Sequence, residues 1–239
     1  EGALPAWLFD HQRHGVGFAL RTGSSALFYD TGLGKTGMAL AWGDEIVRRT
    51  NKPVLMLAPL GVVAQHLGEA ERFGIDAKAS RFGVPPASPR IVVTNYERLE
   101  RFDPNDYAGV ILDESSILKS FTGATTRKLI DAFGQTPYRL ACSATPAPND
   151  HTELGQHSEF LGVLAAPEML SRWFIADQTN MGRYRLKKPA VVAFWNWVAS
   201  WARAVSRPSD LGFSDVGFDM PELVVRRHIV AADRSRDAG

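Results

Sequence analysis

Short apolar runs alternate with segments of helical spacing along the first two thirds of this 239-residue chain. Apolar runs of this length, bounded by turn residues, are typical of buried strands, and they cover residues 25–29, 53–58, 90–94, 109–113 and 138–142. Helical spacing covers residues 36–49, 62–73 and 124–133. Strands that alternate with helices pair in parallel and are covered on both faces. The pattern predicts an α/β fold with a mostly parallel central sheet, in which ligands bind at the C-terminal ends of the strands.

The composition excludes several classes of protein. Hydrophobic residues make up 45% of the chain and charged residues 22%, as in ordinary globular domains. No apolar run approaches the ~20 residues that span a bilayer, so we expect no membrane association. A single cysteine excludes a disulfide scaffold and a cysteine-rich zinc site, and it suits a reducing compartment. The net charge of +1 gives no overall electrostatic reason to bind nucleic acid.

The segment Asp30-Thr31-Gly32-Leu33-Gly34-Lys35-Thr36 lies between a predicted strand and a predicted helix. A glycine-containing loop in this context can turn its backbone N–H groups toward phosphate oxygens at the start of a helix. Lys35 can then reach the β- and γ-phosphates of ATP, and the Thr36 hydroxyl can bind Mg²⁺. The usual pattern has glycine where this chain has Tyr29, so a glycine-rich turn with a chance Lys-Thr pair is the alternative.

Two adjacent carboxylates, Asp113 and Glu114, follow the apolar run at residues 109–113. Hard cations prefer oxygen ligands, so Asp113 is predicted to hold Mg²⁺ directly or through water. Glu114 is predicted to orient and polarise the water that attacks the nucleotide. The alternative is a strand-to-helix turn in which Asp113 caps a helix.

These motifs, in this order, resemble the first RecA-like lobe of superfamily two helicases. The resemblance is strongest to the Swi/Snf-like branch and to phage-encoded, DEAD/DEAH-box-type relatives, and it spans residues 8–229. Further matching segments are Phe9-Asp10-His11-Gln12, Ala58-Pro59-Leu60 with Gln65 and Glu69, Thr94-Asn95-Tyr96-Glu97, Asp113-Glu114-Ser115-Ser116 with Lys119, and residues 140–146 (LACSATP) with Asn149.

The resemblance implies roles for residues outside the two nucleotide motifs. Gln12 would read adenine, although it could be an ordinary surface glutamine. Ser143 and Thr145 would couple nucleotide state to movement, or they could cap the next helix. Pro59 and Thr94 would lie on a rim that contacts the nucleic-acid backbone, where such contacts position a protein without reading sequence.

The clear alternation of predicted strands and helices ends after about residue 164. We therefore divide the chain into a RecA-like ATP-binding lobe at 1–165 and a largely helical extension at 166–239, with a helix over 190–205. The extension combines aromatic residues with basic ones, notably Arg183, Arg185, Lys187 and Lys188. Such a mixture suits nucleic-acid contact. Packing against the lobe, or docking to a second lobe, would also explain it.

The combined prediction is an ATP-dependent helicase or double-strand DNA translocase, with ATP and Mg²⁺ as cofactors, in the cytoplasm of a bacterium or phage-infected cell. In the resembled enzymes ATP binds between two RecA-like lobes, and we find motifs for one. We expect the second lobe to lie beyond this sequence and the chain alone to hydrolyse ATP weakly. The alternatives are a P-loop ATPase with a non-nucleic-acid partner and a non-catalytic nucleotide-binding module.

Overall fold

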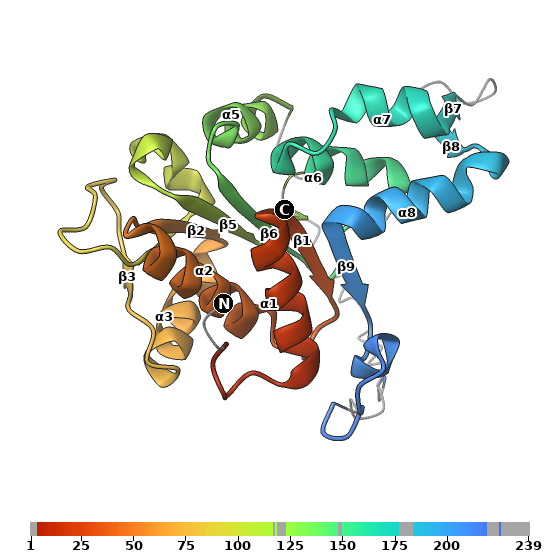
Figure 1. Cartoon of the computed structure of the whole chain (residues 1–239). Helices are drawn as coiled ribbons and strands as arrows, with labels where there is room; N and C mark the ends of the chain where they lie inside the picture. The colour runs from red at the N-terminus through yellow and green to blue at the C-terminus, as the bar shows by residue number, and fades with distance from the viewer. Residues whose placement is uncertain are drawn as a thin grey trace, which may run out of the picture.

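The computed structural model describes residues 4–116, 118, 123–147, 150–176, 184–218 and 225. A sheet of seven strands forms the centre of the molecule, in the order β3-β4-β2-β5-β6-β1-β9 (Figure 1). All of its strand pairs are parallel. The strands are β1 (Ser24–Tyr29), β2 (Val54–Ala58), β3 (Ala77–Ala79), β4 (Ile91–Asn95), β5 (Gly109–Asp113), β6 (Tyr138–Cys142) and β9 (Ala202–Val205). The predicted parallel α/β fold is confirmed.

Helices cover both faces of this sheet. Residues of α1 (Asp10–Thr22), α2 (Lys35–Thr50) and α3 (Val63–Arg72) pack with one set of strand side chains. Residues of α5 (Gly123–Phe133), α6 (Leu154–Leu161) and α8 (Val191–Trp201) pack with the other set. Successive side chains of a strand point to opposite faces. Accordingly, Leu27 and Tyr29 belong to the first cluster, whereas Ala26 and Phe28 belong to the second. This two-sided burial explains why the strands are almost uniformly apolar.

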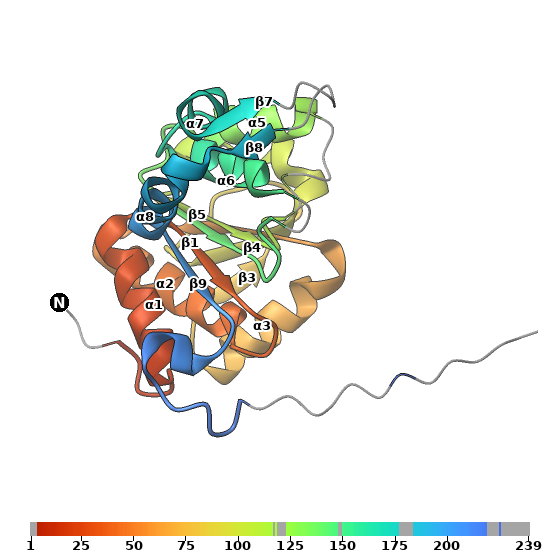
Figure 2. The same cartoon turned by 90° about the vertical axis from the view of Figure 1, so that its right-hand side faces the viewer.

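Helix α7 (Ala166–Trp173), the antiparallel pair β7 (Phe174–Ala176) and β8 (Tyr184–Leu186), and helix α8 form an arm, residues 166–201. The arm extends to one side of the sheet, away from α2 and α3 (Figures 1 and 2). Its aromatic side chains pack mainly on one another. Trp173 lies 4.5 Å from Trp197 and Phe174 lies 5.4 Å from Phe194, measured between ring centroids. Most of the aromatic stripe in the sequence is therefore the core of the arm.

The predicted helix over residues 190–205 is wrong at its C-terminal end. Helix α8 ends at Trp201, and the next four residues form β9, which pairs with β1 at the edge of the sheet. Pairing satisfies backbone groups of β1 that would otherwise lie open, so a tertiary contact overrides the helical pattern. A division at 165 therefore does not separate the sheet from the extension, because β9 belongs to the sheet.

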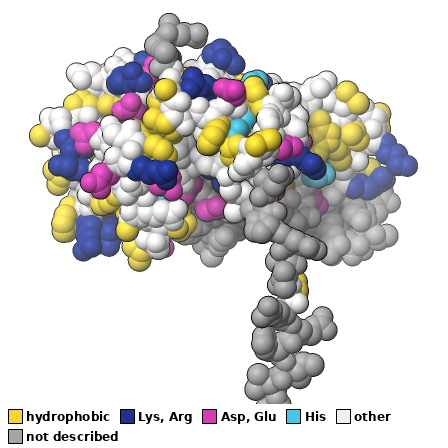
Figure 3. Space-filling model, turned by 90° about the horizontal axis from the view of Figure 1, so that it is seen from below, with side chains coloured by type: hydrophobic (Ala, Val, Ile, Leu, Met, Phe, Trp, Pro, Cys, Tyr) yellow, Lys and Arg dark blue, Asp and Glu magenta, His cyan; other side chains and the backbone are white. Residues whose placement is uncertain are grey.

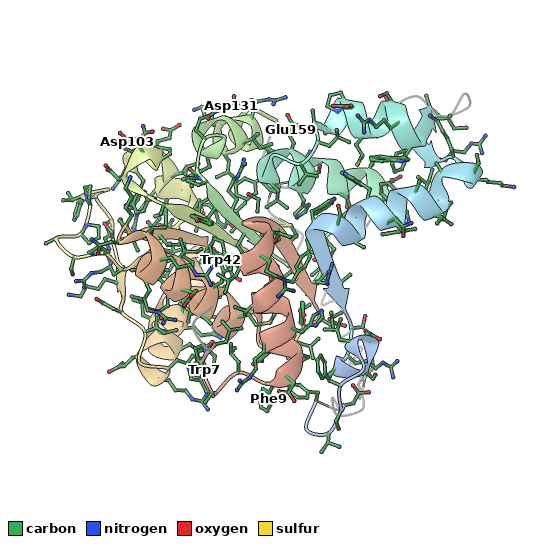
Figure 4. All side chains as sticks on the ribbon, in the orientation of Figure 1. Trp7, Phe9, Trp42, Asp103, Asp131 and Glu159 are labelled. Carbon is green, nitrogen blue, oxygen red and sulfur yellow. The ribbon has the colours of Figure 1, made fainter. Side chains whose placement is uncertain are left out.

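The C-terminal ends of β1 and β9 point toward the lower side of the molecule in Figure 1. Trp7 and Phe9 lie at this end in Figure 4, whereas Asp103 and Asp131 lie at the opposite end. Cys142 is buried in β6 and free, as expected for a small core residue. Among the described residues, no helix is long and apolar enough to cross a membrane.

Candidate nucleotide site at the C-terminal edge of the sheet

The glycine-containing loop lies between β1 and α2, as the sequence predicts. Gly34 immediately precedes α2 and adopts a left-handed backbone with φ 78°. A Cβ atom at this position would clash with Nε2 of Gln12. The loop therefore needs glycine for two reasons: its left-handed backbone angle and the close approach of the Gln12 side chain. Thr31 and Gly32 are exposed on the loop, whereas Leu33 is buried in the core. Leu33 can thus offer only its backbone to a ligand.

Lys35 folds back over the loop that it follows. Its Nζ donates hydrogen bonds to the carbonyl oxygens of Tyr29, at 2.8 Å, and Asp30, at 3.2 Å. Tyr29 occupies the position where glycine is usual, and its side chain is buried with the hydroxyl donating to the carbonyl of His11. The tyrosine side chain points into the core and therefore does not occupy the loop.

Gln12 braces the loop from α1. Its Oε1 accepts a hydrogen bond from the backbone N–H of Phe9, and its Nε2 donates to the carbonyl of Leu33, both at 3.0 Å. The side chain is buried, so the alternative of an ordinary surface glutamine is wrong. Recognition of adenine by Gln12 stays a prediction.

Asp113 and Glu114 end strand β5 and begin the following turn. Asp113 is 7% exposed, and its backbone carbonyl accepts a 2.6 Å hydrogen bond from the hydroxyl of Tyr96. Glu114 has φ 52°, a left-handed conformation that costs a non-glycine residue about 1–3 kcal/mol and is concentrated at functional sites. Burial, and then the negative charge of Asp113, raises the pKa of Glu114 above its ordinary value, while Lys35 opposes the rise.

His66, on α3, contacts the Asp113 carboxylate. Its Nε2 lies 2.9 Å from Oδ2 of Asp113, and its Nδ1 lies 2.7 Å from the carbonyl oxygen of Val62. Burial lowers the pKa of His66, but the hydrogen bond and charge of Asp113 outweigh burial, so the pKa lies above its ordinary value of 6.5. This contact was not predictable from the sequence, because the two partners are 47 positions apart.

Loop and carboxylates meet in one cavity of about 370 Å³, lined by Thr31, Gly32, Gly34, Lys35, Thr36, Val62, Gln65, His66, Glu69, Asp113 and Glu114. The described residues contain no group of three or more His, Cys, Asp or Glu side chains that could hold a metal alone. Mg²⁺ usually takes one or two protein carboxylates and completes its shell with phosphates and water. The hydroxyl of Thr36 and the carboxylate of Asp113 therefore suit Mg²⁺ bound together with a nucleotide.

The predicted coupling residues lie at the end of β6. Ser143 is buried, and its Oγ accepts a 3.0 Å hydrogen bond from the backbone N–H of Thr145. Within the part of the chain that the structure describes, neither side chain is hydrogen-bonded to Glu114. Instead, Oγ of Ser115 lies 3.0 Å from Nε2 of His157 on α6, a buried contact that the sequence did not predict. Coupling by Ser143 and Thr145 stays a prediction.

The predicted nucleic-acid rim lies at the same edge of the sheet. Pro59 follows β2 and is half-buried, whereas Thr94 in β4 is 1% exposed, and its hydroxyl has no partner among the described residues. Thr94 lines a second cavity of about 300 Å³ together with Arg81 and Arg98, two basic residues that the sequence did not single out. Figure 3 shows the molecule from this side, where charges of both signs are interspersed with hydrophobic side chains.

The basic residues of the arm differ in their surroundings. Arg185 and Lys188 are exposed. Lys187 instead donates from Nζ to the carbonyls of Ser171 and Arg172, at 2.9 Å each, and so stabilises the C-terminal end of α7. Arg183 lies outside the described residues, as do Lys119 and Asn149. Two of the predicted contact residues are thus exposed, and one already has a structural role.

Fold and site together define a class. A parallel sheet with a glycine loop after β1 and a carboxylate pair after β5, meeting at the C-terminal edge, is a RecA-like P-loop lobe.

Solved structures that are similar to this chain include an ATPase core and helicase domains. The Sulfolobus solfataricus SWI2/SNF2 ATPase core in complex with dsDNA matches with a TM-score of 0.69 and 20% identity, over 84% of this chain and 45% of that one. The UvsW helicase from bacteriophage T4 matches with a TM-score of 0.54 and 12% identity, over 69% of this chain and 61% of that one. The Pyrococcus furiosus Hef helicase domain matches with a TM-score of 0.52 and 20% identity, over 64% and 36%.

The chain therefore has the fold of a helicase-like RecA lobe and spans less than half the length of the SWI2/SNF2 core. No protein-family model and no curated protein matches the sequence.

Proposed function

We propose that this chain is the nucleotide-binding lobe of an ATP-dependent motor that moves on duplex DNA. One observation carries the proposal: Lys35, Thr36, Asp113 and Glu114, which come from two distant segments of the sequence, line a single cavity. A structural neighbour of the same fold is a SWI2/SNF2 ATPase core in complex with dsDNA, and this likeness supports the choice of polymer.

Each of these side chains has a distinct task in the proposed reaction. Lys35 would exchange its hydrogen bonds to the carbonyls of Tyr29 and Asp30 for hydrogen bonds to phosphate oxygens, because hydrogen bonds between charged groups are about twice as strong as neutral ones. Thr36 and Asp113 would hold Mg²⁺, which neutralises charge on the phosphates. Glu114 would accept the proton of the attacking water. Its raised pKa suits that task, because a general base works best when its pKa approaches the working pH.

Robust turnover is proposed to need a second RecA-like lobe. In related NTPases an arginine finger contributes about 10³–10⁵ in rate, and in two-lobed motors it would come from the second lobe. Within the described residues, no arginine lines the nucleotide cavity. We therefore expect the chain alone to bind ATP and to hydrolyse it slowly.

Contacts to DNA are proposed along the rim and at the arm. Arg81 and Arg98, beside Thr94, would contact the DNA backbone at the rim. Arg185 and Lys188 would contact it at the arm. Such contacts would hold the duplex without reading its sequence. Base stacking by Phe194 and Trp201 is not part of the proposal, because both are buried, whereas Tyr184 and Trp195 are exposed.

Replacing Arg185 and Lys188 together by Ala is expected to weaken binding to a duplex oligonucleotide and to flatten its salt dependence. Each lost phosphate contact lowers the slope of log affinity against log salt by about 0.9, so the slope should fall by about 2. Fluorescence anisotropy at several KCl concentrations measures it. The matched control replaces Arg48 and Lys52, two exposed cations at and just beyond the C-terminal end of α2, and it should leave the slope unchanged. Equal slopes for the arm variant and the wild type would remove the arm from the interface.

A further inference from the structure

His66 bridges two parts of the site that are far apart in sequence. It lies on the first turn and a half of α3, directly after the turn at residues 60–62, and it is 2% exposed. One ring nitrogen reaches the carbonyl of Val62 and the other reaches the carboxylate of Asp113. The imidazole thus connects the turn that follows β2 to the proposed metal ligand at the end of β5.

The carbonyl oxygen of Val62 can only accept a hydrogen bond, so Nδ1 of His66 is the donor in that contact. This tautomer leaves Nε2 facing Oδ2 of Asp113 at hydrogen-bond distance. The bond to Val62 fixes the orientation of the ring, and the ring in turn holds Oδ2 of Asp113. The backbone carbonyl of Asp113 accepts a hydrogen bond from the hydroxyl of Tyr96, in another segment. Asp113 is therefore fixed through both its side chain and its main chain.

The neighbouring carboxylate is held differently. Among the described residues, Glu114 has no hydrogen-bond partner for its side chain, although it lines the same cavity. Within this part of the chain, one carboxylate is thus oriented and the other has no hydrogen bond. An oriented carboxylate suits a metal ligand, because Mg²⁺ tolerates little departure from octahedral geometry. A carboxylate without such a bond suits a base that must move toward water.

We propose that His66 is a positioning residue that holds the Asp113 carboxylate ready for Mg²⁺ and ties it to the turn at residues 60–62. The inference rests on the proposed function, because it assumes that Asp113 binds the metal of a metal–nucleotide complex. Groups that hydrogen-bond to metal ligands tune metal binding, and their loss typically costs about 10- to 100-fold in metal affinity. Movement of the turn would be transmitted to the metal ligand through the ring.

Two substitutions separate the two hydrogen bonds. In His66→Gln the amide nitrogen can take the place of Nε2 and still donate to Asp113. In His66→Asn the amide is too short to reach Asp113 but can take the place of Nδ1. The matched control is His14→Gln, an exposed histidine on α1. The readout is the Mg²⁺ concentration needed for half-maximal binding of a fluorescent ATP analogue, with the affinity in EDTA as the metal-free reference.

His66→Asn is expected to raise that Mg²⁺ midpoint by about 10- to 100-fold and to leave the affinity in EDTA unchanged. His66→Gln and His14→Gln should stay close to the wild type. A wild-type midpoint in His66→Asn, or an equal loss in both His66 variants, would overturn the inference. Failure of the wild type to bind the analogue with Mg²⁺ would instead refute the proposed function.

A second measurement covers the case in which His66→Asn does not fold. The imidazole ¹⁵N resonances of His66 can be assigned in the wild type by their disappearance from the spectrum of His66→Gln. Addition of Mg²⁺ with ADP is expected to shift the Nε2 resonance of His66 and not those of His14. An Nε2 resonance that Mg²⁺ with ADP leaves in place would overturn the inference without any unfolded variant.

Discussion

Replacing Glu114 by Gln is expected to slow ATP hydrolysis by about 10²- to 10⁴-fold while the affinity for Mg²⁺ and ATP changes little. The amide keeps the shape of the side chain and its place in the cavity, but it cannot take a proton from water. Single-turnover hydrolysis of labelled ATP, with the chain in excess, measures even a slow rate. Hydrolysis at the wild-type rate in Glu114→Gln would exclude Glu114 as the base.

The same substitution is expected to stabilise the free protein above the raised pKa of Glu114. Burial and the charge of Asp113 raise that pKa in the folded state above the ordinary value of 4.5. The stability that protonated Glu114 contributes is therefore fully present below pH 4.5 and is lost as the pH rises through the folded-state pKa. Thermal unfolding should show no added stability of Glu114→Gln over the wild type near pH 4 and a clear gain at neutral pH.

Glu100→Gln is the matched control for this pH dependence. Glu100 is exposed and lies 2.7 Å from Nζ of Lys128, so the hydrogen bond and charge of Lys128 lower its pKa. Its replacement should therefore give a small effect of the opposite sign, as for other surface ion pairs. A gain in Glu114→Gln that is equal at all pH values would contradict the electrostatic explanation.

Replacing Lys35 by Ala is expected to lower the affinity for Mg²⁺ and ATP by about 10- to 150-fold, because a hydrogen bond to a charged group contributes about 1.5–3 kcal/mol. Lys35 is positioned at the mouth of the loop by the carbonyls of Tyr29 and Asp30, within reach of the same cavity as Glu114. Isothermal titration calorimetry measures the change. Lys52→Ala, just beyond the C-terminal end of α2, removes the same charge elsewhere and should bind as the wild type does. Wild-type affinity in Lys35→Ala would place the nucleotide in another part of the molecule.

Elements with a local sequence signal were predictable. The strands β1, β2, β4, β5 and β6 have apolar runs long enough to identify, and α2, α3 and α5 have helical spacing. Strand β3 is only three residues long and mostly exposed, so its pattern carries little information. Strand β9 continues an aromatic helical run, and only its pairing with β1 makes it extended. Tertiary contacts determine the conformation of such segments, and these contacts cannot be inferred from a single sequence.

The residues of the candidate site likewise include some that were predictable from the sequence and some that were not. Lys35, Thr36, Asp113 and Glu114 were predictable because each lies in a short motif whose chemistry explains its spacing. His66 and His157 were not, since each meets its partner across more than 40 positions of sequence. Exposure also changed the interpretation of the arm, where Phe194 and Trp201 are buried, Tyr184 and Trp195 are exposed, and the exposed cations Arg185 and Lys188 stay predicted contacts.

Amide hydrogen exchange of the wild-type chain, with and without Mg²⁺ and a non-hydrolysable ATP analogue, tests the proposed nucleotide site most directly. The predicted result is slower exchange at residues 31–36 and 113–116, the two segments that line one cavity. The opposite edge of the sheet has a cavity of its own, of about 280 Å³, beside Asn105, Tyr107 and Thr136. Protection confined to that edge, or no protection at residues 31–36, would contradict the assignment of the nucleotide site.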